Sequence, residues 1–349
     1  TPPMLMSPMM WATMIFTMLT STTIVMSSHH WVLVWLGLEL NTMSIIPIII
    51  KTHHPRATEA ATKYFLIQAA AAALILLAGV LNTWQTGQWS ITHTTPAFTT
   101  IIMMSCMLKL GLAPVHFWYP EVLQGVTLPT ALIISTWQKI APLSLLYLIS
   151  KTPSTTMLMM GLISAIVGGL MGLNQTQTRK LMAFSSIAHM GWLMTALTLN
   201  PKLATMTLMT YIVMTTTVFL TLAPMTMKTI PDLGMAQSCH PTLTTMMMIS
   251  MLSLGGLPPL SGFMPKWIIL NELVSKNLPL MATTLALASL PSLYFYTRTA
   301  YVITLTTPPN SPTTEHKWRF KPNLTPALMV VTSLSIMLLP LTPALVDTM

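Results

Sequence analysis

The sequence predicts an all-α polytopic membrane protein with about eleven transmembrane helices. Three observations lead to this fold class. Hydrophobic residues make up 53% of the 349 residues and charged residues only 7%, whereas soluble domains carry about 25% charged residues. The mean hydropathy is +0.67, and long apolar runs recur along the whole chain. We therefore expect one membrane domain over residues 1–349, without a separate soluble domain.

Each predicted span is an apolar run close to the roughly 20 residues that cross a bilayer as a helix. The first half contains runs at 4–27, 31–50, 63–83, 97–117 and 129–149. The second half contains runs at 155–173, 180–199, 202–224, 242–267 and 279–299, and a last run covers 324–345. Threonine and methionine replace much of the usual leucine and alanine. Helices tolerate this threonine because its hydroxyl can bond a backbone carbonyl one turn back.

Basic residues predict the orientation of these spans, because loops on the cytoplasm-like side are richer in lysine and arginine. With alternating crossings, ten basic residues lie on the side of the N-terminus: Lys51, Arg56, Lys63, Arg179, Lys180, Lys228, Arg298, Lys317, Arg319 and Lys321. Three lie on the opposite side: Lys151, Lys202 and Lys276. We therefore expect the N-terminus on the cytoplasm-like side, which is the matrix in a mitochondrion, and the C-terminus on the other.

Two of the predicted spans contain glycine and proline where a continuous helix would not place them. They are Gly111 and Pro114 in the fourth span, and Gly255, Gly256, Pro258 and Pro259 in the ninth. Proline removes a backbone hydrogen bond, so we expect a broken helix at each place. The breaks lie five spans apart and thus in opposite orientations. This predicts two inverted five-helix repeats at about 1–150 and 155–305, followed by a C-terminal helix at about 324–345.

Four ionisable residues lie inside otherwise apolar segments: Glu39, Lys109, Lys139 and Lys266. A charge at the bilayer centre costs roughly 2.5–3.5 kcal/mol, and such residues usually mark ion or proton pathways. We interpret the four as a proton path in which Glu39 and Lys109 form an opposite-charge pair. The alternative is a set of buried ion pairs that fixes helix register. Lys266 lies near the end of its span and could also extend its ammonium to the interface.

Two histidines are further candidates for proton transfer, since imidazole titrates near neutral pH. His189 lies in the middle of a span, in FSSIAHMGW, and His116 lies at the first break. Either could equally be a hydrogen-bonded packing residue. The GGLMG stretch from Gly168 to Gly172 predicts close helix packing. It does not predict a dinucleotide-binding loop, because no strand precedes it.

Several other kinds of site are excluded by the pattern of residues. Cys106 and Cys239 lie far apart and fit neither a disulfide framework nor a metal or iron–sulfur cluster. Histidine, cysteine and carboxylate residues do not show metal-ligand spacing, and no flavin, haem or nucleotide motif is present. The net charge of +9 comes from basic residues scattered between apolar runs. We therefore expect no cofactor or metal on this chain and no nucleic-acid partner.

Four segments together carry a family resemblance: KLGLAPVHFWYPEVLQG (109–125), TWQKIAPLS (136–144), GLNQTQTRKLMAFSSIAHMGW (172–192) and LSLGGLPPLSGFMPKW (252–267). They resemble the antiporter-like membrane subunits of respiratory complex I, the proton-pumping NADH–ubiquinone oxidoreductase. The resemblance covers essentially the whole chain. It implies the two inverted repeats, each with a broken helix. It also implies a path through Glu39, Lys109, Lys139 and Lys266, with His116 and His189 in the connecting hydrophilic axis.

The function that this resemblance implies is proton translocation coupled to electron transfer from NADH to ubiquinone elsewhere in the complex. FMN, iron–sulfur clusters and ubiquinone are expected on other subunits. The expected partners are other membrane-arm subunits and membrane lipid, including cardiolipin at a basic matrix rim, and the expected location is the mitochondrial inner membrane. Two alternatives stay open. One is a stand-alone cation/proton antiporter, disfavoured because no midplane Asp or second Glu offers a hard-cation cage; the other is a purely structural assembly subunit.

Overall fold

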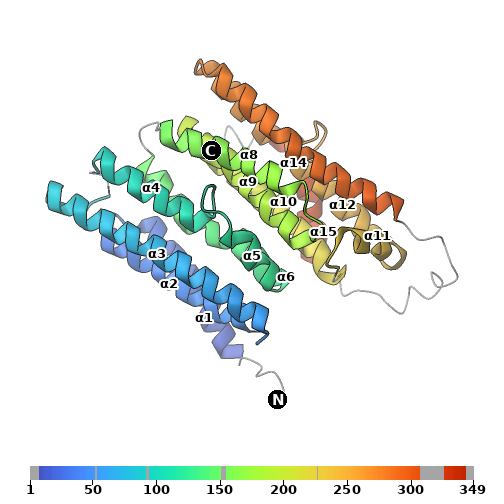
Figure 1. Cartoon of the computed structure of the whole chain (residues 1–349), viewed down its shortest axis with the longest axis horizontal. Helices are drawn as coiled ribbons and strands as arrows, with labels where there is room; N and C mark the ends of the chain where they lie inside the picture. The colour runs from blue at the N-terminus through green and yellow to red at the C-terminus, as the bar shows by residue number, and fades with distance from the viewer. Residues whose placement is uncertain are drawn as a thin grey trace. The chain divides into compact units, whose positions relative to one another are not determined.

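The computed structural model describes residues 8–51, 53–91, 94–150, 155–225, 227–306 and 326–342. Helices joined by short connections make up nearly all of it (Figure 1). The described part contains two isolated β-bridges and no strand, which confirms the predicted all-helical class. The chain forms two compact units, Thr1–Met157 and Leu158–Met349.

The first unit is arranged around its longest helix, α3, which lies against α2, α4 and α5. Its helices are α1 (Pro8–Ser27), α2 (Trp31–Ile50), α3 (Pro55–Thr86), α4 (Pro96–Leu110), α5 (Trp118–Gly125), α6 (Leu128–Ser135), the 3₁₀ turn η1 (Trp137–Lys139) and α7 (Ile140–Ile149). Proline opens α3 and α4 at their first position, where its missing N–H costs nothing. Gly87 ends α3 with φ of 70°, a conformation that favours glycine.

The second unit is arranged around α10, which contacts α9, α12, α13 and α15. Its helices are α8 (Thr155–Gly172), which begins just before the unit boundary, α9 (Thr178–Leu199), α10 (Pro201–Met225), α11 (Ile230–Cys239), α12 (Pro241–Gly255), α13 (Phe263–Ser275), α14 (Pro279–Leu305), α15 (Pro326–Met337) and the 3₁₀ turn η3 (Leu339–Leu341). At the two predicted breaks the chain forms pairs of short helices, α4 with α5 in the first unit and α12 with α13 in the second.

Within the described residues, seven helical segments are long and apolar enough to cross a membrane. They are α1, α2, α3, the segment from α6 to α7, α8, α9 and α10. Of the other predicted spans, 97–117 covers α4 and the turn that follows it, 242–267 covers α12 and the start of α13, and the last two lie on α14 and α15. The total of eleven spans and their inverted repetition stay predictions. Residues 4–7 of the first run, residues 324–325 and 343–345 of the last run, and the basic residues Lys151, Lys317, Arg319 and Lys321 lie outside the described residues.

Helix α11 was not predicted, because its sequence was interpreted as part of a connection between two spans. The helix begins with a capping box in which the Thr229 N–H donates to the Asp232 carboxylate at 3.0 Å. Hydrogen bonds from the side chain and then the backbone of Thr229 lower the pKa of Asp232. Thr229 followed three residues later by an acidic residue was the signal in the sequence for this helix start.

Threonine hydroxyls bond the backbone of their own helices, as predicted. Thr217 donates to the Met214 carbonyl at 2.6 Å, and Thr215 donates to the Tyr211 carbonyl at 2.8 Å. Such bonds satisfy the hydroxyl without water, which a lipid environment cannot supply. The frequent threonines are therefore compatible with buried and lipid-facing positions alike.

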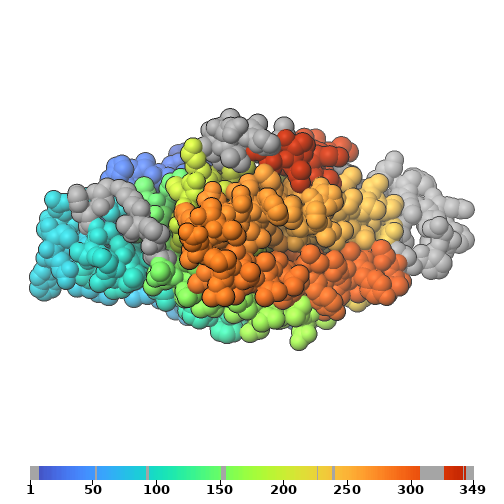
Figure 2. Space-filling view, turned by 90° about the horizontal axis from the view of Figure 1, so that it is seen from above, coloured from blue at the N-terminus to red at the C-terminus, as the bar shows by residue number. Residues whose placement is uncertain are grey.

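Helix α14 lies on the surface of the second unit (Figure 2, orange), and large apolar side chains are exposed along one of its faces. The large side chains exposed there are Leu280, Leu287, Leu290, Tyr294, Tyr301 and Leu305. Their spacing of three, four or seven residues places them on one side of the helix. An apolar stripe that faces outward instead of inward is typical of a helix whose solvent is lipid.

Helices α8 and α9 approach closely through small residues. A Cβ atom built on Gly168 would lie 2.6 Å from the Ala188 backbone nitrogen, and one on Gly191 would lie 2.6 Å from the Gly161 carbonyl oxygen. A Cβ on Gly172 would lie 2.9 Å from the ring of Phe295. This confirms the close helix packing predicted from the Gly168 to Gly172 stretch, since backbones meet where side chains are absent.

We predict that Gly168→Ala destabilises the second unit by about 1–3 kcal/mol, because the added methyl group meets backbone that cannot move aside. The measurement is the thermal unfolding midpoint of the detergent-purified protein. The control is Leu170→Ala on the same turn of α8, where the side chain is 52% exposed. An equal loss in both variants would contradict the close-packing explanation.

Candidate functional site

The first break separates α4 from α5 and places His116 inside the first unit. Helix α4 ends at Leu110, and Gly111 follows with φ of 72°. The chain is not α-helical again until Trp118. His116 is only 3% exposed, and its Nδ1 lies 3.2 Å from the Pro114 carbonyl oxygen. The break therefore brings a buried imidazole next to backbone that a continuous helix would have kept bonded.

Lys109 lies in the last turn of α4, directly before this break, and is 6% exposed. Among the described residues its Nζ has no hydrogen-bond acceptor. Its backbone carbonyl is satisfied by α3, because Gln68 Nε2 donates to it at 3.2 Å. A lysine near a helix C-terminus complements the helix dipole, so the local position is favourable even though the ammonium is unpaired.

Glu39 and Lys109, both of which the structure describes, make no direct salt bridge with each other, but the charge of Glu39 attracts the Lys109 ammonium across space. The predicted opposite-charge pair is therefore an interaction across space, without direct contact between the two side chains. The half-buried Glu39 carboxylate instead accepts a hydrogen bond from the Thr42 hydroxyl at 3.2 Å. Thr42 lies one turn further along α2, so the local partner holds the carboxylate on its own helix.

Lys139 lies on a 3₁₀ turn, although the sequence predicted a continuous span over 129–149. The helix is interrupted between α6 and α7, and the Lys139 N–H bonds the Thr136 carbonyl at 3.4 Å. Pro142 explains the interruption, because it has no N–H for the Gln138 carbonyl and its ring crowds that carbonyl. The Lys139 side chain is 3% exposed, and its Nζ lies 5.2 Å from the centre of the Tyr119 ring, within the range of a cation–π contact.

Lys109 and Lys139 line one small cavity in the first unit. Its volume is about 10 Å³, and its other lining residues are Tyr64, Gln68, Leu110, Trp118, Tyr119, Ile134 and Gln138. A cavity needs a volume of about 10–15 Å³ to hold a water molecule. The space between the two lysines is thus at the threshold for a single bridging water.

Sequence reasoning missed the amide and phenol groups that surround these lysines. Gln138 Nε2 donates to Asn41 Oδ1 at 3.1 Å, and the Tyr64 hydroxyl donates to Gln138 Oε1 at 3.4 Å. Together with Gln68, these residues place uncharged polar groups inside apolar helices. Their signal in the sequence was an Asn or Gln within a predicted span, which is costly in lipid unless it is bonded.

The second break separates α12 from α13 in the second unit. Helix α12 ends at Gly255, Gly256 follows with φ of 83°, and α13 begins at Phe263. Pro258 and Pro259 lie in the turn between them. Lys266, in the first turn of α13, donates from Nζ to the Gly255 carbonyl at 2.7 Å. Its ammonium thus bonds the C-terminus of α12 and does not extend to the interface.

His189 and Lys266 line a second cavity, which lies wholly in the second unit. Its volume is about 20 Å³, enough for one water molecule. The other lining residues are Trp192, Thr207, Thr210, Tyr211, Met214, Gly262, Pro265 and Ile269. The imidazole of His189 lies 5.7 Å, centre to centre, from the Tyr211 ring. A histidine, a lysine and two threonines therefore line a cavity that is large enough for one water molecule.

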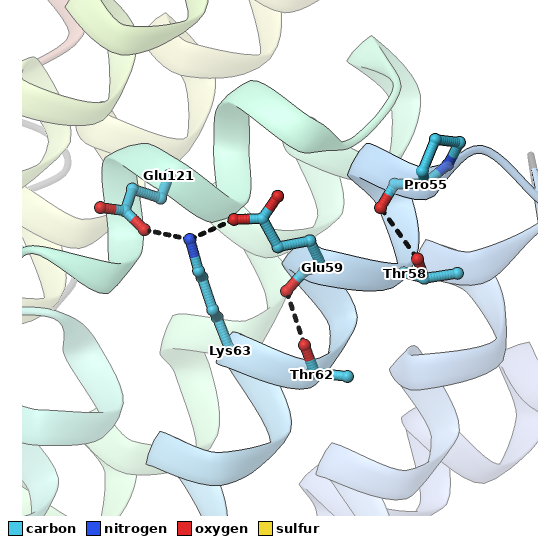
Figure 3. Close-up of polar contacts among 6 residues, drawn as sticks. All are labelled: Pro55, Thr58, Glu59, Thr62, Lys63 and Glu121. Carbon is cyan, nitrogen blue, oxygen red and sulfur yellow. Dashed lines mark hydrogen bonds and ion pairs between the residues drawn. The ribbon is translucent and has the colours of Figure 1, made fainter.

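A charged group that was not predicted joins α3 to α5 at the surface of the first unit (Figure 3). Lys63 Nζ lies 2.5 Å from a Glu59 oxygen and 2.7 Å from a Glu121 oxygen. Glu59 is one turn away on the same helix, whereas Glu121 is 58 residues away. The sequence identified Lys63 only as a basic residue of a connection, because the distant partner cannot be read from spacing.

The described part of the chain has no group of three or more His, Cys, Asp or Glu side chains that could hold a metal ion. Cys106 is buried in α4, and the side chain of Cys239 lies outside the described residues. The polar groups that do converge are lysine, histidine, amide and hydroxyl groups. They suit the transfer of protons better than the binding of a metal.

Two known families match this chain. The family described as NADH:quinone oxidoreductase/Mrp antiporter, TM, matches residues 28–291, and the family described as NADH dehydrogenase subunit 2 C-terminus matches residues 293–346. Relatives named NADH-ubiquinone oxidoreductase chain 2 include one from Varanus melinus, 50% identical over 97% of this chain and 99% of the relative. Another, from Salmo salar, is 52% identical over 93% of both chains.

Two solved structures have the same fold. A chain of respiratory complex I from Thermus thermophilus is 26% identical, with a TM-score of 0.80 over 96% of this chain and 80% of that chain. A chain of the Mrp complex from Dietzia sp. DQ12-45-1b also has a TM-score of 0.80, over 95% of this chain and 75% of that chain. The second is only 14% identical, so it shows a shared fold alone.

We predict that Lys63→Met loosens α5 from α3 and lowers the thermal midpoint of the protein in low salt. In about 1 M salt the difference from the unchanged protein should shrink, because both ion pairs are exposed and screened. Lys202→Met is the control, since Lys202 makes no ion pair among the described residues. A salt-independent loss would show that packing of the lysine stem, and not its charge, joins the two helices.

Proposed function

Because this chain belongs to the NADH-ubiquinone oxidoreductase chain 2 family of complex I membrane subunits, we propose that the lysines and histidines inside its two units carry protons. The path uses Glu39, Lys109, Lys139 and His116 in the first unit. It uses His189 and Lys266 in the second. The chain itself carries out no redox step in this proposal. Electron transfer from NADH to ubiquinone takes place on other subunits, which hold the FMN, the iron–sulfur clusters and the quinone.

One observation carries this proposal. In each unit, a lysine that is buried (Lys109) or half-buried (Lys266) lies where a helix is broken and lines a cavity of about the size of a water molecule. Ordinary packing would fill such places with apolar side chains, since an intramembrane lysine is costly. Broken helices that expose backbone to a wet cavity are the usual setting for ion and proton sites in transporters.

The geometry supports separate roles for the charged groups. Lys109 and Lys139 share a cavity, so a change in the charge of one alters the proton affinity of the other. Glu39, held by Thr42 on α2, acts on Lys109 through the electric field and not through a direct ion pair. In the second unit, a water in the cavity would connect His189 to Lys266 and carry a proton between them.

The proposed membrane location and partners of the chain are based on the same family membership. We place the chain in the mitochondrial inner membrane, with the N-terminus on the matrix side and the C-terminus on the opposite side. The support is the excess of basic residues in the even-numbered connections, together with the vertebrate relatives. Its partners are other membrane-arm subunits and lipid, including cardiolipin at the basic matrix rim.

We predict that Lys139→Met preserves assembly of the complex and lowers the number of protons translocated per NADH oxidised. Loss of a positioned proton-transfer group costs about 10²–10⁴-fold in rate, so transfer through this subunit should nearly stop. The measurement is proton uptake by proteoliposomes that contain the variant complex, with Lys202→Met as the matched control. An unchanged ratio of protons to NADH would disprove the role of Lys139.

Two alternative functions give different results in related measurements. If the buried charges serve assembly alone, Lys139→Met would reduce the amount of complex and leave the ratio of protons to NADH intact. If the chain is a free antiporter, the isolated chain would exchange sodium or potassium for protons without NADH. Neither alternative has a specific observation in its favour, since the described residues offer no cluster of carboxylates for a hard cation.

Membership of the complex is tested by native gel electrophoresis after extraction in mild detergent. We predict that this chain migrates with a very large band that stains for NADH dehydrogenase activity. A chain that migrates alone, as a small and inactive species, would favour the free antiporter.

A further inference from the structure

Gln138, next to Lys139 in the sequence, connects the 3₁₀ turn to two other helices. Its Nε2 donates to Asn41 Oδ1 on α2, and its Oε1 accepts from the Tyr64 hydroxyl on α3. All three side chains are at least 91% buried, with exposures of 9%, 3% and 2% for Gln138, Asn41 and Tyr64. The nitrogen and the oxygen of the Gln138 amide therefore each make a hydrogen bond to a helix that is distant in the sequence.

The 3₁₀ turn depends on such support from outside. One of its internal hydrogen bonds, from the Lys139 N–H to the Thr136 carbonyl, is long at 3.4 Å, and a second runs from the Ile140 N–H to the Trp137 carbonyl. The geometry of a 3₁₀ turn is in general poorer than that of an α-helix, and Pro142 removes the donor that would otherwise close the next α-helical turn. The bonds of Gln138 therefore add support from α2 and α3 to a turn that is weak by itself.

The face of α3 that carries Tyr64 also makes a hydrogen bond to the end of α4, where Lys109 lies. Tyr64 and Gln68 are four residues apart and so adjacent on the helix surface. Tyr64 bonds the neighbour of Lys139, while Gln68 bonds the backbone carbonyl of Lys109. One turn of α3 therefore fixes both lysine-bearing segments at the cavity that the two lysines share.

We propose that Asn41, Tyr64 and Gln138 are positioning residues that hold the 3₁₀ turn so that Lys139 faces Lys109 across their shared cavity. This inference rests on the proposed role of Lys139 in proton transfer. The three residues act through Lys139 and do not themselves carry the proton. Small errors of placement matter here, because a displacement of about 1 Å can cost about 10²-fold in rate.

The first test is the structure of the complex with Gln138→Leu, determined by electron cryo-microscopy. Leucine has a similar volume but cannot make either hydrogen bond. We expect residues 136–140 to rearrange and the Lys139 ammonium to leave the Tyr119 ring. An unchanged turn, with Lys139 still against Tyr119, would overturn the inference whatever the role of Lys139 in pumping.

The second test is proton pumping by the same complex in proteoliposomes. We expect proton-coupled turnover to fall about tenfold, at unchanged abundance of the complex. Asn82→Leu is the matched control, because Asn82 is also a buried amide of the first unit, and its Oδ1 accepts from the Thr95 N–H away from both lysines. An equal loss of pumping in the control would overturn the inference by showing that any lost amide has this effect.

The third test combines Gln138→Leu with Lys139→Met. If Gln138 acts through Lys139, the double variant should pump as poorly as Lys139→Met alone, and a further loss would overturn the inference. If Lys139→Met by itself leaves pumping unchanged, the proposed function fails, and the cryo-microscopy result still decides whether the three residues position the turn.

A milder variant keeps the test possible if Gln138→Leu fails to assemble. Tyr64→Phe removes only the hydroxyl and retains the ring, which packs edge-on to Trp118. We expect a smaller change of the same kind, with a shift in the pH profile of pumping that a purely structural loss would not produce. Full pumping with an unshifted profile would overturn the contribution of Tyr64.

Discussion

The need to satisfy backbone carbonyls away from water governs both halves of this structure. A helix that ends inside a membrane leaves its last carbonyl groups without partners, and each costs several kcal/mol in lipid. The carbonyl of Lys109 accepts a hydrogen bond from Gln68 Nε2, and the carbonyl of Gly255 accepts one from Lys266 Nζ. In both units a side chain from another segment bonds a carbonyl at the end of the broken helix. These donors therefore help to stabilise the breaks, together with backbone bonds such as those from Gly111 and Gly256.

The two units satisfy the carbonyl groups at their breaks with different donors. This difference determines whether the ammonium of the nearby lysine is itself bonded to the helix end. In the first unit an uncharged amide bonds the carbonyl, so the Lys109 ammonium is left at the cavity without a hydrogen-bond acceptor. In the second unit the ammonium of Lys266 is itself the donor to the end of α12. Deprotonation leaves Lys266 with fewer N–H groups and removes the charge that complements the helix end. In the proposed path, proton release from Lys266 would therefore be coupled to the stability of the break.

Uncharged polar groups outnumber ions in the interior of the first unit. The amides of Asn41, Gln68 and Gln138 bond the backbone and each other, and the two lysines are left as the charges at the cavity. Such an arrangement is rigid, because its hydrogen bonds join α2, α3, α4 and the 3₁₀ turn. In the proposed path, this rigidity keeps the two lysines in place while their protonation states change.

The sequence by itself determined the helical class, the positions at which α4 and α12 end, and the close contact at Gly168. These features depend on local chemistry: apolar run length, the missing N–H of proline and the missing Cβ of glycine. Even the 3₁₀ turn at Lys139 had a local signal in Pro142, and α11 had one in Thr229 and Asp232.

Only the tertiary structure decided which side chains meet. It placed Glu39 with Thr42 instead of Lys109, Gln138 with Asn41, and Lys63 with Glu121. The last two pairs are separated by 97 and 58 residues. Composition and spacing describe one helix at a time, whereas such contacts depend on the register and rotation of helices packed side by side. A shift of one residue turns a side chain by about 100° around its helix axis, which is enough to replace one partner by another.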